Sequence, residues 1–95
     1  MRGLNLDHLH AFVEVMERGS FSAAGQRFNL TQPAISLQIQ QLERRLGVRL
    51  IERVGRRAVP TTAGHTLLTH IRQIDAAVAG AMNALQSHRQ GVVGR

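Results

Sequence analysis

The stretch from Ser20 to Leu46 constrains the fold more than any other part of this sequence. Its first segment has Phe21, Ala24 and Phe28 at positions i, i+3 and i+7, the spacing of one face of a helix. The apolar residues of its longer second segment recur at spacings of 4, 3 and 4: Ile35, Ile39, Leu42 and Leu46. The pattern predicts two neighbouring helices, each with one buried apolar face.

The residues at the ends of these segments are typical of helix ends. Ser20 and Thr31 each precede a segment and can accept a hydrogen bond from its first turn. Pro33 falls in the first turn of the second segment, where a missing backbone N–H is harmless. The pair Asn29-Leu30 makes the break between them. We therefore predict a helix-turn-helix over about residues 20–46.

The outer face of the second predicted helix carries amides and a hydroxyl, where a solvated helix usually carries Glu and Lys. The residues on this face are Gln32, Ser36 and Gln40, with Gln38 and Gln41 at its edges. A glutamine side chain both donates and accepts hydrogen bonds, as contact with the edge of a base requires. This face therefore indicates a helix that reads the major groove of DNA.

The charge of the chain points the same way. The 95 residues include 12 basic and 6 acidic side chains, for a net charge of +6, and every basic residue is an arginine. Arginine suits phosphate and guanine better than lysine does, and a basic balance indicates a polyanionic partner. Solubility alone is the alternative explanation. The aromatic content of 3%, all of it Phe, argues against a stacking platform for single strands.

Composition and motifs argue against several other classes of protein. Without cysteine there is no disulfide framework and no thiolate metal site. No apolar run is long enough for a membrane span, so we expect a cytoplasmic protein without a membrane partner. We find no catalytic or phosphate-loop motif, and expect neither an enzyme nor a cofactor or metal. The histidines share no metal-ligand spacing and are interpreted as surface or satisfied residues: His8, His10, His65, His70 and His88.

A first helix is predicted before the helix-turn-helix. Asn5 can cap it, and Gly19 is a natural stop. Its expected apolar face consists of Leu6, Leu9, Val13 and Met16, with Phe12 alongside. We expect this helix to cover the back of the helix-turn-helix and complete its core.

A small hairpin is predicted after the helix-turn-helix. Two runs of β-type residues, Val48–Val54 and Ala58–Pro60, flank a glycine-containing turn. The expected tip is basic, with Arg53, Arg56 and Arg57. A hairpin with cations at its tip, following a reading helix, is a wing that lies along the DNA backbone or minor groove. For Arg57 alone, a solvated turn residue fits equally well.

A long helix is predicted to end the chain, from Thr62 to about Arg89, with Thr61 or Thr62 as its cap. Its apolar residues recur at spacings of 4, 3, 4, 3 and 4: Leu67, Ile71, Ile74, Val78, Ala81 and Leu85. At ~1.5 Å per residue the helix is about 40 Å long, too long for so small a domain to cover. A second copy of the chain is the simplest partner. A membrane-surface helix is the rival interpretation, but its polar face lacks the basic residues required.

These residues together resemble the DNA-binding region of the LysR-type bacterial transcriptional regulators. The motifs that match are GSFSAA, TQPAIS, LERRLG and Thr61 with Ala63-Gly64, supported by Leu9, Phe12, Gln38-Ile39, Leu50 and Glu52-Arg53. The resemblance implies a mainly α winged helix-turn-helix, three helices plus a short β-hairpin wing, followed by a long linker helix that pairs two copies. It also implies homodimers, often assembled into tetramers, on inverted-repeat sites in double-stranded DNA near promoters.

The resemblance also suggests how the chain is divided. We expect a winged helix-turn-helix domain over 1–60, with the wing at about 48–60, a linker helix over 61–90 and a hinge over 91–95. The family's C-terminal effector-binding domain is absent from this sequence, so we expect a fragment whose small-molecule effector would come only with that domain.

Three residues depart from the family pattern. Ile51 stands where Phe is common, a core change that we expect to be tolerated. Pro60 replaces a common Leu, so we expect the return strand of the wing to end early. Leu37 occupies a position that is often Arg, and we interpret it as a contact to a thymine methyl group rather than as a core residue.

The candidate DNA-binding residues combine the family motif with the wing and the helix caps: Ser20, Ser22, Thr31, Gln32, Pro33, Ser36, Leu37, Gln40, Arg53 and Arg56. For Ser20, Ser22 and Thr31, helix capping alone is the alternative role. Arg53, at the wing base, is the expected phosphate contact, whereas Arg44 and Arg45 are interpreted as a solvated face or a local ion pair with Glu43. Two other function classes stay open: a helical protein-interaction module and a non-specific architectural DNA binder.

Overall fold

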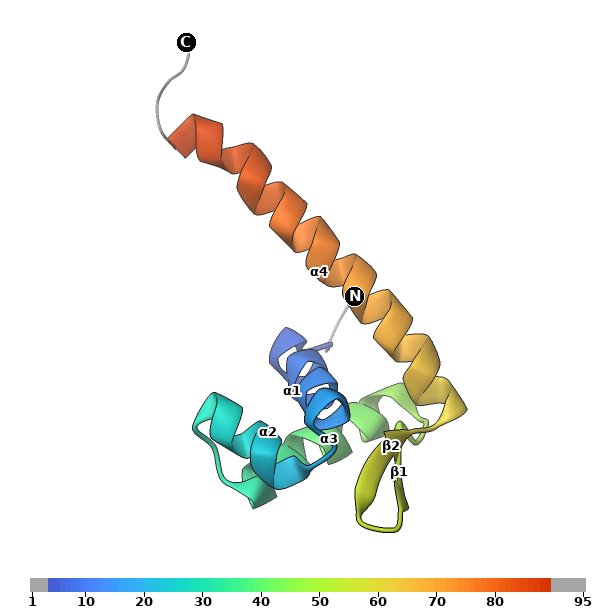
Figure 1. Ribbon diagram of the computed structural model, residues 1–95. Helices are drawn as coiled ribbons and strands as arrows, with labels where there is room; N and C mark the ends of the chain where they lie inside the picture. Colours follow the sequence, from blue (N-terminus) through green and yellow to red (C-terminus); the bar gives the residue numbers. More distant parts are fainter. Residues whose placement is uncertain (1–3, 90–95) are drawn as a thin grey trace.

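The computed structural model describes residues 4–89, which form four helices and one two-stranded hairpin (Figure 1). In chain order the elements are α1 (Leu6–Arg18), α2 (Phe21–Phe28), α3 (Gln32–Leu46), β1 (Ile51–Val54), β2 (Arg57–Pro60) and α4 (Thr62–Arg89). The fold is the predicted mainly α winged helix-turn-helix with a long helix after it. The hinge expected at 91–95 lies outside the described residues.

The helix ends follow from the local sequence as predicted. Four side-chain oxygens accept a hydrogen bond from a backbone N–H of the helix that follows, at 2.8 to 3.2 Å: Asn5, Ser20, Thr31 and Thr61. Of the two candidates for α4, Thr61 is therefore the cap. α1 and α3 end at Gly19 and Gly47, whose φ angles of 73° and 75° favour glycine.

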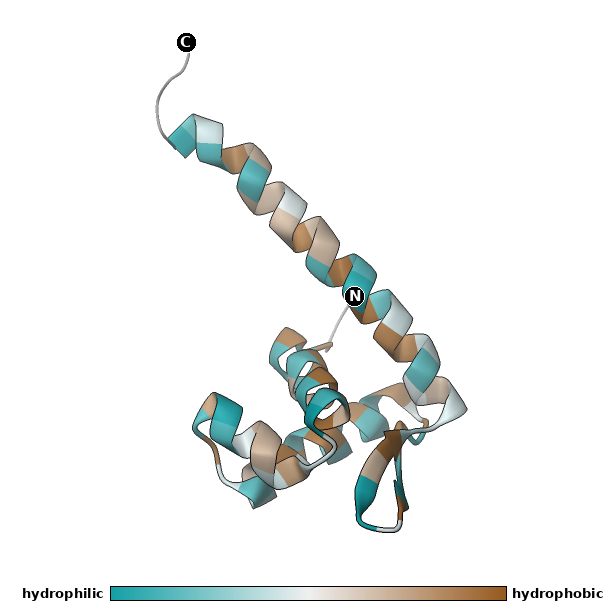
Figure 2. Cartoon of the chain, in the orientation of Figure 1, coloured by the Kyte–Doolittle hydropathy of each residue, from teal (hydrophilic) through white to brown (hydrophobic). Residues whose placement is uncertain are grey.

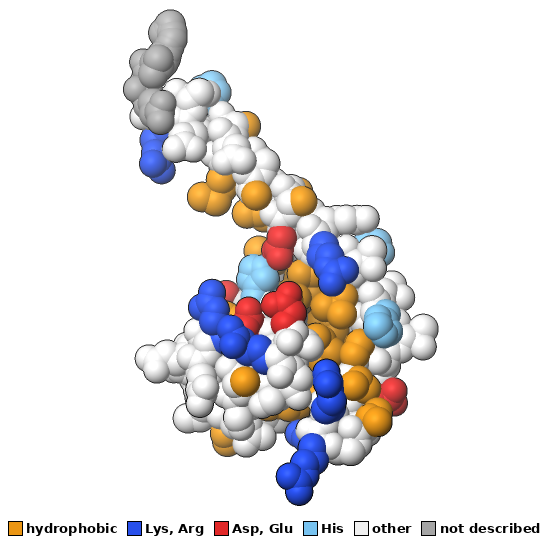
Figure 3. Space-filling view, viewed as in Figure 1, with side chains coloured by type: hydrophobic (Ala, Val, Ile, Leu, Met, Phe, Trp, Pro, Cys, Tyr) orange, Lys and Arg blue, Asp and Glu red, His pale blue; other side chains and the backbone are white. Residues whose placement is uncertain are grey.

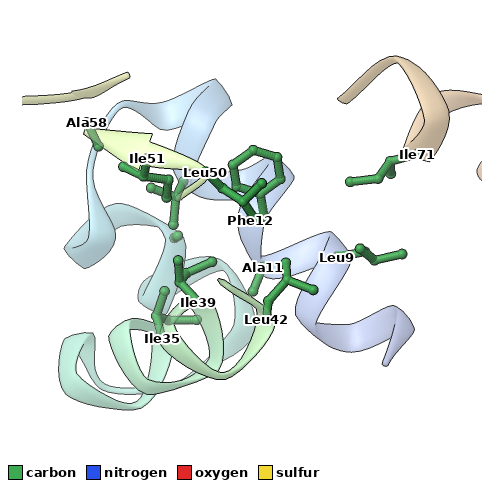
Figure 4. Close-up of a cluster of buried hydrophobic side chains, with 12 residues drawn as sticks. Leu9, Ala11, Phe12, Ile35, Ile39, Leu42, Leu50, Ile51, Ala58 and Ile71 are labelled. Carbon is green, nitrogen blue, oxygen red and sulfur yellow. The ribbon is translucent and has the colours of Figure 1, made fainter. Parts of the chain in front are cut away.

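The core lies where α1 meets α2, α3 and the hairpin, and Figure 4 shows its side chains converging from these elements and from α4. The largest fully buried side chains are Phe12, Leu9, Ile35, Leu42, Leu50, Ile71 and Val15. α1 is thus a central helix rather than a cover on one side. Because α1 contacts all of these elements, a small number of buried residues is enough to hold three helices and a hairpin together.

Two expected core residues are exposed. Leu6 is 46% exposed, and on α1 the buried residues include Ala11 and Val15, which the single expected face left out. Ala11 and Val15 are buried because α1 is covered on more than one side, by the helix-turn-helix and by α4, whereas Leu6 is the first residue of the helix and stays exposed. Leu46 is also exposed, since burial along α3 ends at Leu42, before the last turn.

The hairpin is four residues long on each side and closes through a two-residue turn at Gly55-Arg56. Val48 and Leu50, expected in the first strand, precede β1. The expectation that Pro60 would shorten the return strand was wrong. Pro60 pairs with Ile51, and hydrogen bonding continues beyond it from the Thr61 N–H to the Leu50 carbonyl, at 3.0 Å. Both strands are edges, where a residue without an N–H is tolerated.

The long helix α4 divides into a packed half and a projecting half (Figure 1). The packed half, residues 62–75, lies against α1 and the hairpin, and its last residue, Asp75, contacts His10 of α1 at 2.8 Å. The projecting half, residues 76–89, extends beyond the rest of the molecule, and Figure 2 shows that hydrophobic residues recur along it. The long dimension of the molecule, 58 Å, comes from this projection.

Candidate nucleic-acid interface

The outward face of α3 is polar and accessible over its first three turns. Gln32, Pro33 and Gln40 are exposed and Ser36 is half-buried, while Ile35, Ile39 and Leu42 on the other side are buried in the core. The buried side of α3 is therefore held rigidly by packing, and its outer side is free to make contacts. Such a surface can enter a major groove and present hydrogen-bonding groups to base edges.

Leu37 lies on the same exposed surface. Its side chain is 50% exposed, so it is not part of the core. The placement agrees with the interpretation of Leu37 as a surface residue. Its contact with a thymine methyl group stays a prediction.

The turn between α2 and α3 is held by a close backbone approach at Gly25. The Leu30 N–H donates to the Gly25 carbonyl at 2.8 Å, and a Cβ on Gly25 would lie 2.6 Å from the Leu30 carbonyl oxygen. A side chain at this position would push the two helices apart. Gly25 thus sets the angle at which α2 presents α3, a role that the sequence pattern did not reveal.

The N-terminal end of α2 lies next to the hairpin. The guanidinium of Arg53 lies over the ring of Phe21, the first residue of α2, with 5.1 Å between the guanidinium carbon and the ring centroid. Ser22 is exposed in the same first turn. Backbone N–H groups, a hydroxyl and a cation therefore meet at one place, which is an arrangement suited to a phosphate.

The other two arginines of the hairpin differ in their placement. Arg56 is exposed in the turn itself, as expected. Arg57 belongs to β2, and its guanidinium turns back toward Gly19, lying 3.7 Å from where a Cβ on that glycine would be. It therefore faces the junction of α1 and α2 and not the tip, so the expectation of three cations at the tip was wrong.

Charges are unevenly distributed over the face shown in Figure 3. Arg side chains reach the lower end, over the hairpin, whereas several acidic side chains gather higher, where α1 faces α4. Asp75 there is paired with His10, and Glu14 is paired with Arg18 at 2.7 Å. These two acidic groups thus lie away from the wing, where exposed Glu52 of β1 is accompanied by the cations Arg53, Arg56 and Arg57, so the balance of charge at that end suits a polyanion.

The predicted seam of α4 is not one continuous exposed stripe. Ile71 is only 1% exposed and belongs to the protomer's own core, and Leu67 and Ile74 pack against that core. Ile71 is therefore covered within the protomer, which corrects its expected place on an exposed seam between two copies. Along the projecting half, Val78, Ala81 and Leu85 are exposed, and so is Met82 beside them.

The carboxylate of Glu43 has a role that sequence reasoning missed. It was considered as a partner of Arg44 or Arg45, which are both exposed. Instead it accepts hydrogen bonds from the backbone N–H groups of Leu50 and Ile51. The contact joins residues seven and eight positions apart across a turn, so helical spacing gives no signal of it.

Two other kinds of site receive no support from the part of the chain that the structure describes. Residues 4–89 contain no group of three or more His, Cys, Asp or Glu side chains placed to hold a metal ion. Within the same residues, no helix has the length and apolar character needed to span a membrane.

Comparison with known families identifies the chain. Residues 6–65 match the model of the bacterial regulatory helix-turn-helix protein, lysR family. The match covers α1, the helix-turn-helix, the hairpin and the start of α4. The chain belongs to the LysR family. These residues are its DNA-binding domain.

Curated relatives of this LysR-family chain are transcriptional regulators. It is 44% identical over 92 residues to an uncharacterized HTH-type transcriptional regulator in the ibpB-leuC intergenic region of Azotobacter vinelandii, covering 97% of this chain and 64% of the relative. It is also 44% identical over 92 residues to the HTH-type transcriptional regulator CbbR of Rhodospirillum rubrum, covering 94% of this chain and 31% of that protein. The chain thus spans only part of the length of these relatives.

Solved structures show the same similarity. The DNA-binding domain of BenM, crystallised with catB site 1 DNA, superimposes with a TM-score of 0.87 at 32% identity, covering 97% of this chain and 99% of that one. The CbnR DNA-binding domain, crystallised with DNA, gives a TM-score of 0.82 at 34% identity, covering 90% of this chain and 99% of that one. The LysR-family winged helix-turn-helix is therefore the observed fold.

Proposed function

We propose that this LysR-family chain binds specific sequences in double-stranded DNA as a homodimer, as the DNA-binding module of a transcriptional regulator acting at promoters with inverted-repeat sites. The observation that carries the proposal is the accessible outer face of α3, with Gln32, Ser36 and Gln40, in a domain whose wing carries exposed arginines. The two similar domains crystallised with DNA support the same partner.

In this proposal the base-reading residues are Gln32, Ser36, Leu37 and Gln40, since they share the exposed surface of α3. Thr31 and Pro33 begin that helix and bring its N-terminal end to the groove, where the Thr31 hydroxyl both caps the helix and can donate to a phosphate. The residue types allow bidentate contacts to adenine and an apolar contact to thymine.

The proposed backbone contacts surround the first turn of α2. Ser20 accepts a hydrogen bond from the Ala23 N–H, and its own hydroxyl hydrogen is free to donate. Ser22 and Arg53 lie beside it, and Arg56 extends the contact along the wing. These contacts supply affinity and register and carry no sequence information of their own.

The proposed dimer forms through α4. Its projecting half is a helix on which Val78, Met82 and Leu85 are exposed, and no other part of residues 4–89 buries these three side chains. Pairing of two copies would bury them and place two reading helices at a fixed separation, which is how a dimer recognises an inverted repeat. We propose tetramers only for a longer protein that contains this chain.

The remaining parts of the proposal concern organisation. We divide the chain into the winged domain at 1–60, the linker helix at 61–90 and a hinge at 91–95. A small-molecule effector would act through a further domain of the kind found in longer family members. Because its proposed partner is chromosomal DNA, the proposed place of action is the cytoplasm.

Selection of bound duplexes from a random pool, followed by titration at rising salt, tests the proposal. We expect an inverted-repeat consensus and binding that is about a thousandfold or more tighter than to scrambled duplex. A chain that retains no duplex would instead be a protein-interaction module. Tight binding without a consensus would make it an architectural DNA binder.

Two single variants refine that experiment. Gln32→Ala should cost roughly 1–3 kcal/mol on the selected duplex and relax preference at one base pair. Arg56→Ala should weaken binding to all duplexes alike and reduce the salt slope by about 1. Equal losses on selected and scrambled duplex for Gln32→Ala would contradict its role as a base contact.

A further inference from the structure

The end of α3, the chain before β1 and the start of α4 meet at one junction. Glu43, in the last turns of α3, has a side chain that is only 16% exposed. Its Oε2 accepts hydrogen bonds from the backbone N–H of Leu50 at 2.8 Å and of Ile51 at 3.3 Å. The guanidinium of Arg49 lies 3.6 Å from the same oxygen. One carboxylate of α3 thus holds the chain at the point where the wing begins.

Thr61 holds the same segment from the other side. Its N–H donates to the Leu50 carbonyl at 3.0 Å, and its hydroxyl donates to the Arg49 carbonyl at 2.7 Å. That hydroxyl also accepts the capping hydrogen bond from Gly64, at 3.0 Å. The segment Arg49-Leu50 is therefore fixed between α3 and α4, and it has little freedom to move with respect to either.

Packing at the junction is close enough to exclude a side chain. A Cβ on Gly64 would lie 2.3 Å from the Leu50 carbonyl oxygen and 3.1 Å from the Cβ of Pro60. The first turn of α4 therefore rests directly on the backbone that Glu43 holds. The hydrogen bonds of Glu43 are part of a rigid joint, and are not chance contacts at a surface.

Glu43 also lies on the strip of α3 that carries the base-reading residues. Ser36 is four residues and Glu43 eleven residues after Gln32, and eleven residues are close to three full helical turns. The N-terminal end of this strip faces outward, and its C-terminal end binds the base of the wing. The position of the wing is thus set relative to the residues proposed to read DNA.

We propose that Glu43 is a positioning residue for DNA binding: it holds the wing in register with α3, so that Arg53 and Arg56 reach the backbone of the duplex that α3 reads. The inference rests on the proposed function. Glu43 does not contact DNA, because its carboxylate is turned to the protein's own amides and would repel a phosphate. An ionised acceptor makes stronger hydrogen bonds than a neutral one, which suits it to this role.

A double-mutant cycle between Glu43 and the wing tests the proposal on the selected duplex. In the wild-type background, Arg56→Ala should weaken binding about three- to tenfold at 0.1 M salt, because one phosphate contact is lost. In the Glu43→Ala background the same change should have less than about a twofold effect, since the wing is no longer held against the duplex. If the loss of affinity in the double variant equals the product of the losses in the two single variants, Glu43 has no part in positioning the wing.

The matched control is Glu17→Ala. Glu17 is exposed in the last turn of α1, and its removal changes the net charge by the same amount. The full effect of Arg56→Ala should persist in that background. If Glu17→Ala suppresses the effect equally, the coupling reflects net charge and the proposal is wrong.

Glu43→Gln keeps the cycle decisive if Glu43→Ala does not fold. Its amide oxygen still accepts hydrogen bonds but carries no charge, so the effect of Arg56→Ala should fall by about half. An undiminished effect would overturn the proposal. NMR supplies a readout without DNA: amide hydrogen exchange at Leu50 and Ile51 should accelerate in Glu43→Gln while exchange along α3 is unchanged. Failure of the wild type to select any duplex would count against the proposed function, whereas these exchange rates test the joint alone.

Discussion

The packed and projecting halves of α4 have the same apolar spacing and opposite surroundings. In the packed half, Ile71 is 1% exposed and lies in the core with α1. In the projecting half, Leu85 stands at an equivalent position of the repeat and is 62% exposed. The repeat therefore specifies which side of a helix is apolar, but not whether the same protomer or a second copy covers it. Four predictions test this difference.

Ile71→Asp should have the largest effect. It places a charge in the core without a partner, and we expect a loss of about 3–5 kcal/mol in the free energy of unfolding. Urea unfolding followed by circular dichroism measures the loss. A variant that folds normally but no longer dimerises would show that Ile71 lies in an interface between copies instead.

Leu85→Asp should leave the fold intact and separate the proposed dimer. The charge falls on an exposed side chain, so the unfolding midpoint of the domain should change little. Affinity for an inverted-repeat duplex should fall about a hundredfold, because the two half-sites are no longer bound by linked copies. Sedimentation velocity should show monomers. Ser87→Asp, on another side of the helix, should stay dimeric, and a dimeric Leu85→Asp would refute the assignment.

Two glycines make a matched pair across the halves. Gly64→Ala should destabilise the domain by about 1–3 kcal/mol, because its Cβ would overlap the Leu50 carbonyl. Gly80→Ala should stabilise α4 by up to about 1 kcal/mol, because nothing lies within 4 Å of its Cβ and alanine favours a helix. Thermal melts of both variants give the comparison. A destabilised Gly80→Ala dimer with an unchanged monomer would mean that a partner helix approaches closely there.

The smallest expected effect concerns the ion pair at the end of the packed half. His10 and Asp75 are 2.8 Å apart and about half exposed, so their coupling should be below about 1 kcal/mol. A double-mutant cycle with His10→Ala and Asp75→Ala, read by urea unfolding, measures it. A coupling well above this range would mean that the pair, and not the apolar contacts, fixes α4 on the domain.

Local patterns predicted the parts of the fold that depend on near neighbours. Ser20 and Thr31 were identified as caps because a cap is decided by the next three residues, and both make the expected hydrogen bonds. The burial of residues that depend on contacts distant in the sequence was harder to predict. Leu6 and Leu46 have the right spacing for burial, but the elements formed by residues 4–89 leave both exposed, and spacing carries no information about where those elements pack.

The candidate interface shows the same limit. The face of Gln32, Ser36 and Gln40 could be predicted because all three belong to one helix. Two other contacts could not be predicted from the sequence: the guanidinium of Arg57 lies near Gly19, and the carboxylate of Glu43 accepts a hydrogen bond from Leu50. Each contact joins elements whose relative placement emerges only from the packed fold. The resemblance to the LysR family pointed to the motif LERRLG without saying what its glutamate does.

The position of Arg53 over the ring of Phe21 has a consequence for the thermodynamics of binding. An arginine that is free in solution loses conformational entropy when a phosphate immobilises it, at a cost of about 0.5–1.5 kcal/mol for a side chain of this kind. Stacking on an aromatic ring restricts the guanidinium of Arg53 before any DNA arrives. Much of that ordering therefore takes place when the protein folds, and a phosphate at the α2 N-terminus would meet a preorganised cation.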